Sequence, residues 1–180
     1  RRSAVFAAGA AAILLLSACT SGTASEGGDA ASDTIPPDTL TIATGEPAYA
    51  PWVLNDDPES GEGFEAAVAY AVAEELGYEK SQVEWVRTTF DSAIAPGPKD
   101  FDFNLQQFSV NEDRAKAVDF SSPYYTTTQA VVASAGTDAA DAKSIADLKG
   151  APIGVASGTT SLTVVEDVIA PTQDLQVFNT

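Results

Sequence analysis

The sequence predicts an α/β fold with a largely parallel sheet, because strand-like and helix-like segments alternate along most of the chain. Residues 40–45 alternate apolar and polar side chains, and residues 83–87 repeat such a strand pattern. Between them, residues 64–76 are rich in alanine and end at Gly77, as a helix does. We expect ligands of such a sheet to bind beyond the carboxyl ends of its strands.

Further elements follow the same alternation. The helix at 64–76 carries Val68, Val72 and Leu76 at helical spacing, and we expect these to form its apolar face. The acidic segment 55–63 is expected to be a hairpin connection, because its spacing does not fit a calcium loop. We also predict helices at 90–95, 111–118 and 162–169, a capped turn at 144–150, strands at 101–107, 152–156 and 174–178, and an extended segment at 124–134.

The amino-terminal segment has the pattern of a signal peptide. Arg1 and Arg2 precede an apolar run over 4–16, which is too short to span a bilayer. The residues L-S-A-C that end at Cys19 resemble a bacterial lipobox, which implies cleavage before Cys19 and lipid attachment to it. The alternatives are a buried helix with a free thiol, or a twin-arginine export signal. We therefore predict a signal peptide over 1–18 and a lipidated Cys19.

The next segment and the composition limit the function further. Residues 19–39 are rich in Ser, Thr, Gly, Ala, Asp and Pro, which predicts a disordered tether. The chain has no histidine and one cysteine, so imidazole bases, histidine-dependent nucleophiles and most zinc sites are excluded. The formal net charge of −17 disfavours nucleic acid as a partner. We expect no cofactor and no metal.

The residues 106–125, Q-Q-F-S-V-N-E-D-R-A-K-A-V-D-F-S-S-P-Y-Y, are the segment most indicative of a site. They place the Arg114 guanidinium beside free backbone N–H groups where a strand passes into a helix. Such a junction suits a small carboxylate. The alternative is a solvated or salt-bridged surface arginine. In the same way, several aromatic residues can be packing residues instead of a ligand cage, namely Tyr49, Trp52, Phe90, Phe108 and Tyr124.

Several motifs occur in a fixed order: G-E-P-A-Y-A-P-W, G-F-E before a helix, T-T-F-D-S-A-I, the segment 109–125, and L-K-G-A-P-I-G-V-A-S-G-T-T. This order resembles the extracytoplasmic substrate-binding lipoproteins of polar amino-acid ABC importers, the bacterial extracellular solute-binding proteins of family 3. The resemblance implies a two-lobed periplasmic-binding-protein type II fold. Residues 40–134 would form lobe I with the first hinge strand. Residues 135–180 would begin lobe II, which indicates that the chain is a fragment.

The resemblance also implies roles for single residues. Arg114 would pair with the α-carboxylate of a free amino acid, and Ser109 would contact its α-carboxylate or α-ammonium. The main chain at Gln107 would accept from the α-ammonium. Thr159 and Thr160 would close on the carboxylate from lobe II, and the alternative is that they only cap the following helix.

The remaining implied roles concern the ligand side chain. Tyr49 and Phe90 would sandwich it, with Trp52 in support and Phe108 nearby. Glu46 would face its polar end, which favours a polar or cationic amino acid.

The function expected from this resemblance is binding without catalysis. The protein would be a monomer, lipid-anchored to the outer face of the cell membrane, that delivers a free amino acid to ABC permease subunits. Two alternatives remain open. One is an enzyme on the same fold, similar to cyclohexadienyl dehydratase, and the other is the ligand-sensing input domain of a receptor.

Overall fold

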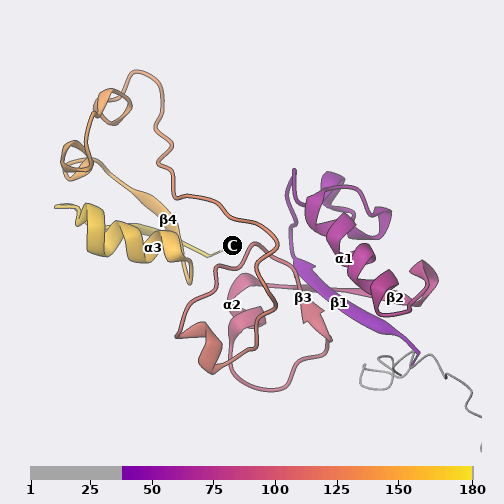
Figure 1. Ribbon diagram of the computed structural model, residues 1–180. Coiled ribbons are helices and arrows are strands. Elements are labelled where there is room, and N and C mark those ends of the chain that lie inside the picture. The colour runs from indigo at the N-terminus through magenta and orange to yellow at the C-terminus, as the bar shows by residue number, and fades with distance from the viewer. Residues whose placement is uncertain (1–37, 180) are drawn as a thin grey trace, which may run out of the picture.

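The computed structural model of the chain describes residues 38–179, which contain two separate parallel sheets (Figure 1). The first has the strand order β2-β1-β3 and the second pairs β4 with β5. The strands are β1 (Leu40–Gly45), β2 (Val83–Thr88), β3 (Phe103–Asn104), β4 (Gly154–Ala156) and β5 (Gln176–Phe178). We call the part built on the first sheet the first lobe and the part built on the second sheet the second lobe. The expected signal peptide, Cys19 and most of the tether lie outside the described residues.

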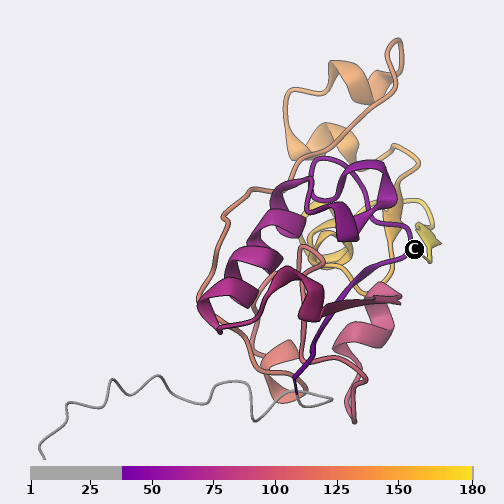
Figure 2. The same ribbon diagram turned by 90° about the vertical axis from the view of Figure 1, so that its right-hand side faces the viewer.

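The helices are short apart from the first. They are α1 (Phe64–Glu75), α2 (Phe90–Ile94) and α3 (Thr160–Val164), which continues into the π-helical turn η8 (Val165–Ile169). In two views at right angles, α1 and α2 lie on opposite sides of β1 (Figures 1 and 2). Within residues 38–179, every helix is too short or too polar to cross a lipid bilayer.

The core of the first lobe forms around β1, every residue of which is buried. Leu40 and Ile42 pack against Ala69 and Ala73 of α1. The expected apolar face of this helix was therefore wrong in part, because Val72 and Leu76 are each 38% exposed. The buried face carries alanines instead, and their small side chains allow the helix to lie close to the sheet.

The third strand is shorter than the sequence predicts, and side chains join the backbone bonding at both of its ends. The Asp102 and Leu105 N–H groups still donate to the Thr41 and Ala43 carbonyls of β1, at 2.8 and 3.0 Å. Before β3, the backbone N–H of Thr41 donates to Asp102 Oδ2 at 2.8 Å. After it, the backbone N–H of Gln107 donates to Glu65 Oε1 at 2.9 Å. Gln107 also has a φ of 53°, which no strand residue adopts. Only two residues remain in the regular ladder.

Two other expected elements take a different form. The helix expected at 111–118 is a single 3-10 turn, η5 (Arg114–Lys116), in which the Asn111 side chain accepts from the Arg114 N–H. The expected hairpin at 55–63 is a pair of 3-10 turns, η2 (Leu54–Asp56) and η3 (Pro58–Ser60). A third 3-10 turn, η4 (Lys80–Gln82), leads into β2.

The second lobe has its own small core, made by Leu148, Val155, Val165 and Ile169. The capped turn expected at 144–150 is confirmed as η7 (Ile145–Leu148), where the side chains of Ser144 and Asp147 form a capping box. Another 3-10 turn, η6 (Asp138–Asp141), precedes it. The long segment leading into this lobe crosses from the first lobe without forming a strand (Figure 1). The lobe boundary after residue 134 stays a prediction.

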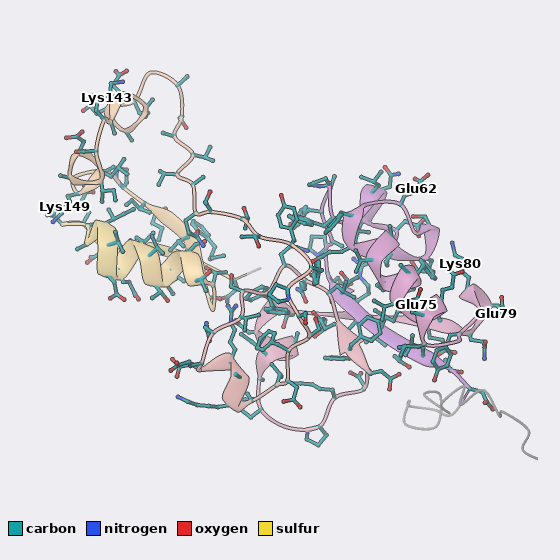
Figure 3. All side chains as sticks on the ribbon, viewed as in Figure 1. Glu62, Glu75, Glu79, Lys80, Lys143 and Lys149 are labelled. Carbon is teal, nitrogen blue, oxygen red and sulfur yellow. The ribbon has the colours of Figure 1, made fainter. Side chains whose placement is uncertain are left out.

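Charged side chains mark the outer ends of the molecule. Glu62, Glu75, Glu79 and Lys80 lie around α1, on the side away from the second lobe (Figure 3). Lys143 and Lys149 lie at the opposite end, on the second lobe (Figure 3). These charges are therefore far from the region where the two lobes meet.

The packing of α1 can be tested by substituting leucine at one buried and one partly exposed position of the helix. Ala69→Leu introduces a large side chain at a position with 0% exposure, which should destabilise the fold by about 1–3 kcal/mol. Val72→Leu, at a position that is 38% exposed, should change stability by about 0.5 kcal/mol or less. Thermal unfolding followed by circular dichroism would measure both. Equal effects of the two substitutions would contradict this assignment of the buried face.

Candidate functional site

The candidate site lies where the three parallel strands of the first lobe end. The carboxyl ends of parallel strands meet at one edge of a sheet, and ligands bind there. The segment 46–53 follows β1, α2 follows β2, and the segment 105–113 follows β3. The expected first-lobe residues are thus brought to the same edge of the sheet.

Arg114 is buried, with 8% of its surface exposed, so the alternative of a solvated surface arginine is wrong. Its Nη1 donates to the Ser109 carbonyl at 2.7 Å, and its Nη2 donates to the Gly158 carbonyl at 2.8 Å. The guanidinium therefore joins a carbonyl of each lobe. Burial lowers the pKa of Arg114 because it removes water from the charged form. An arginine nevertheless stays charged in proteins.

Two aromatic rings lie beside this guanidinium. The ring centroids of Phe90 and Phe108 are 4.2 Å apart with an interplanar angle of 35°. The guanidinium carbon of Arg114 lies 5.4 Å from the Phe90 centroid and 5.5 Å from the Phe108 centroid. Both distances are within the range of cation–π contacts, about 6 Å. The structure thus brings Phe90, Phe108 and Arg114 into one cluster.

The other expected aromatic residues lie apart from this cluster. Tyr49 is 64% exposed, and the ring contacts found within residues 38–179 do not include it. Trp52 makes edge-on contacts with Phe64 at 5.9 Å and with Tyr125 at 5.1 Å. These rings connect the loop after β1 to the start of α1. The sandwich of Tyr49 and Phe90 is not formed in this structure and stays a prediction.

An ion pair that the sequence analysis missed holds the loop after β1. Arg87, at the end of β2, forms an ion pair with Asp56, and its Nε donates to the Gly45 carbonyl at 2.8 Å. The Ala48 N–H donates to Asp56 Oδ1 at 2.8 Å. The Ala48 hydrogen bond and the Arg87 contact lower the pKa of the Asp56 carboxyl. Glu46 is exposed in the same loop. No sequence signal pairs an arginine and an aspartate 31 residues apart.

The two threonines of the second lobe have different partners. Thr159 caps α3, since its Oγ1 accepts from the Leu162 N–H at 3.3 Å and donates to the Ala156 carbonyl at 2.8 Å. Thr160 faces the first lobe, where its Oγ1 lies 3.3 Å from Ser109 Oγ. The structure therefore brings Ser109 and Thr160 together, whereas the Thr159 hydroxyl is engaged in the cap.

A cavity of about 370 Å³, open to solvent, lies at this junction of the lobes. Arg114, Thr159 and Thr160 line it together with Gly158 and Asn111. Its size falls within the range of about 300–1,000 Å³ that is usual for small-molecule sites. The other expected site residues are not among those that line it, namely Glu46, Tyr49, Trp52, Phe90, Gln107, Phe108 and Ser109. Within residues 38–179, no group of His, Cys, Asp and Glu side chains could hold a metal ion.

Glu65 is a second residue that the sequence analysis missed. Its carboxylate is 1% exposed and accepts from the Gln107 N–H at 2.9 Å, from the Gln107 side-chain amide, and from the Tyr124 hydroxyl at 2.6 Å. Burial raises the pKa of the Tyr124 hydroxyl, and the hydrogen bond to Glu65 adds to this effect. The available signal was an acidic residue in the G-F-E motif that opens an alanine-rich helix.

Comparison with known proteins identifies the family. Residues 40–172 match the family described as bacterial extracellular solute-binding proteins, family 3. The chain belongs to this family. An ancestral arginine-binding protein with bound glutamine has a similar structure, with a TM-score of 0.66 and 34% sequence identity over 79% of this chain and 61% of that one. The expected two-lobed type II fold is thereby confirmed.

Curated relatives of this family 3 chain are named as amino-acid-binding proteins. The L-arginine-binding protein of Pseudomonas aeruginosa is 34% identical over 64% of this chain and 43% of its own length. A probable histidine-binding protein of Campylobacter jejuni is 32% identical over 67% of this chain and 46% of its own length. The chain therefore spans less than half the length of these relatives.

Gly158 offers a test of the contact between the lobes. It has a φ of +68°, and a Cβ there would overlap the Asp91 carboxylate of the first lobe. Because the exposed Asp91 side chain can rotate away, we expect Gly158→Ala to break the hydrogen bond between Ser157 and Asp91, which favours separated lobes and raises the radius of gyration measured by small-angle scattering. Gly136→Ala is the matched control, because its φ is +80° and nothing lies within 4 Å. Both variants carry a backbone cost of roughly 1–2 kcal/mol. The same scattering from both would contradict the assigned contact.

Proposed function

We propose that the full-length protein binds a free amino acid outside the cell and delivers it to an ABC permease. The observation that carries this proposal is the buried guanidinium of Arg114 at a cavity between the two lobes. Relatives named as arginine-, histidine- and cystine-binding proteins support it. Their names describe binding proteins, and we propose likewise that this protein binds its ligand without converting it.

The physical basis of the proposed binding is that a ligand carboxylate would pair with the buried positive charge of Arg114. Within residues 38–179 the guanidinium donates only to carbonyl dipoles, at Ser109 and Gly158. A ligand carboxylate would accept from the remaining N–H donors of Arg114 and supply a full negative charge. Arginine presents a planar fork that matches a carboxylate, which lysine does not. The hydroxyls of Ser109 and Thr160, 3.3 Å apart, would lie at the same junction.

The side chain of the ligand would extend towards the loop after β1. Glu46 is exposed there, and the Asp56–Arg87 ion pair holds the loop in place. A carboxylate at this position favours a cationic or polar side chain. In this arrangement, Tyr49 is free to move onto the ligand, since 64% of its surface is exposed. Phe90 would supply the opposite face.

Arg114 can be tested with a thermal-shift panel of amino acids on the full-length protein. A ligand at 100 times its Kd stabilises the folded state by about 2.7 kcal/mol. We expect arginine or lysine to raise the Tm of the wild type more than leucine does. Arg114→Ala and Arg114→Lys should abolish this response.

Lys116→Ala is the matched control, because Lys116 lies in the same 3-10 turn and its side chain is 73% exposed. It should leave the ligand-induced shift unchanged. A full shift in Arg114→Lys would show that the guanidinium does not bind the carboxylate. No shift with any amino acid in the wild type would overturn the proposed function.

We further propose that Cys19 carries a lipid that anchors the protein to the outer face of the membrane. The L-S-A-C residues that end at Cys19 support this. Cys19→Ala should move the protein from the membrane fraction into the soluble extracytoplasmic fraction, as measured by fractionation and immunoblotting. A variant that stays with the membrane in the same proportion would exclude lipid anchoring through this thiol.

A further inference from the structure

One carboxylate bonds to both ends of the segment that carries Arg114. The segment 108–123 contains Ser109 and Arg114, and its regular structure is limited to the 3-10 turn η5. Gln107 precedes this segment and Tyr124 follows it. Both residues donate hydrogen bonds to Glu65, from Gln107 N–H at 2.9 Å and from the Tyr124 hydroxyl at 2.6 Å. Sixteen residues of mostly irregular chain thus begin and end at one side chain.

Glu65 is itself held on a rigid element. It lies in the first turn of α1, and its backbone N–H donates to the Trp52 carbonyl at 2.9 Å. Farther along the same helix, Ala69 and Ala73 pack against β1 with at most 1% exposure. A carboxylate anchored in this way gives a fixed reference point for the chain that bonds to it.

The degree of burial makes these hydrogen bonds energetically important. Glu65 is 1% exposed, and a buried carboxylate is costly unless donors satisfy its oxygens. Gln107 supplies two of these donors, its backbone N–H and its side-chain amide. The same residue has a φ of 53°, which is uncommon for a residue other than glycine. The contacts with Glu65 therefore hold Gln107 in a backbone conformation that turns the chain towards Ser109.

We propose that Glu65 is a positioning residue for the ligand-binding arginine. It fixes Gln107 and Tyr124, so that Ser109 and Arg114 meet the second lobe at Gly158 and Thr160. The part of this inference that concerns ligand affinity rests on the proposed function. The part that concerns the order of the segment 108–123 does not depend on a ligand.

Two substitutions at position 65 distinguish the effect of the lost hydrogen bonds from the effect of altered packing. Glu65→Leu keeps most of the volume but leaves the donors of Gln107 and Tyr124 without an acceptor. Glu65→Gln keeps an acceptor, since Gln107 N–H and the Tyr124 hydroxyl both donate to the same atom, Oε1. Its amide nitrogen would face the Gln107 side chain, which can rotate to present its own oxygen. The conservative variant is therefore expected to restore the arrangement.

A milder pair of variants tests one end of the segment alone. Tyr124→Phe removes one donor to Glu65. Tyr125→Phe is the matched control, because it lies next in the chain and is 55% exposed, and no hydrogen bond of its hydroxyl occurs within residues 38–179. This pair keeps the inference testable if Glu65→Leu does not fold.

The decisive measurement is hydrogen–deuterium exchange of the full-length protein without ligand. Glu65→Leu should raise exchange in peptides covering 108–123 more than in peptides from α1, and Glu65→Gln should not. Tyr124→Phe should raise exchange near the end of the segment, unlike Tyr125→Phe. The inference would be overturned if Glu65→Leu exchanged in this segment at the same rate as the wild type, or if exchange rose equally throughout the first lobe. If Glu65→Leu is unfolded, the inference would be overturned by a Tyr124→Phe variant whose exchange in this segment equals that of the wild type.

Calorimetric titration with arginine or lysine adds a second readout, at a temperature where each variant is folded. Glu65→Leu should weaken binding at least tenfold, and Glu65→Gln should stay within about threefold of the wild type. Unchanged affinity in a folded Glu65→Leu would also overturn the positioning role. If the wild type binds no amino acid, the proposed function fails, and the exchange comparison still decides the role of Glu65.

Discussion

The site depends on a positive charge that is buried at the junction of the two lobes and bonded only to dipoles. Arg114 donates to one carbonyl in each lobe, and the ion pairs found within residues 38–179 do not include it. Its neighbours Phe90 and Phe108 present rings and displace water. Since burial costs a charge its hydration, an anion that reaches the guanidinium regains part of that free energy. The arrangement therefore favours a carboxylate over a neutral ligand.

The other buried or partly buried charges near this site already have partners. Arg87 pairs with Asp56 and holds the loop after β1, and Glu65 accepts hydrogen bonds from both ends of the segment 108–123. These groups stabilise the loops without offering a binding site. This separates the charges that maintain the structure from Arg114, the charge to which our proposal assigns the ligand carboxylate.

The sequence was sufficient to predict those strands and helices whose signals lie within their own residues. The strand at 40–45 was predicted from its alternating apolar and polar side chains, and the structure has β1 there. The helix at 64–76 was predicted because alanine favours helix and Gly77 ends it. The strand expected at 101–107 is reduced to Phe103–Asn104. The Asp102 side chain accepts from the Thr41 N–H, and the Gln107 N–H donates to the Glu65 side chain, and these partners lie 61 and 42 residues away in the chain. Local patterns also identified Arg114, but they could not reveal Asp56 or Glu65, whose roles depend on such distant partners.

The hydrogen bonds described between the lobes are few, and their weakness determines how easily the lobes can separate. Besides the Arg114 bond, they include Ser109 with Thr160 at 3.3 Å and Ser157 with Asp91 at 3.2 Å. A hydrogen bond between neutral groups contributes only about 0.5–1.5 kcal/mol net, because water replaces it when the lobes part. Such contacts favour a closed arrangement weakly and leave it reversible. A ligand that bonds to both lobes would then supply the additional free energy that selects the closed state.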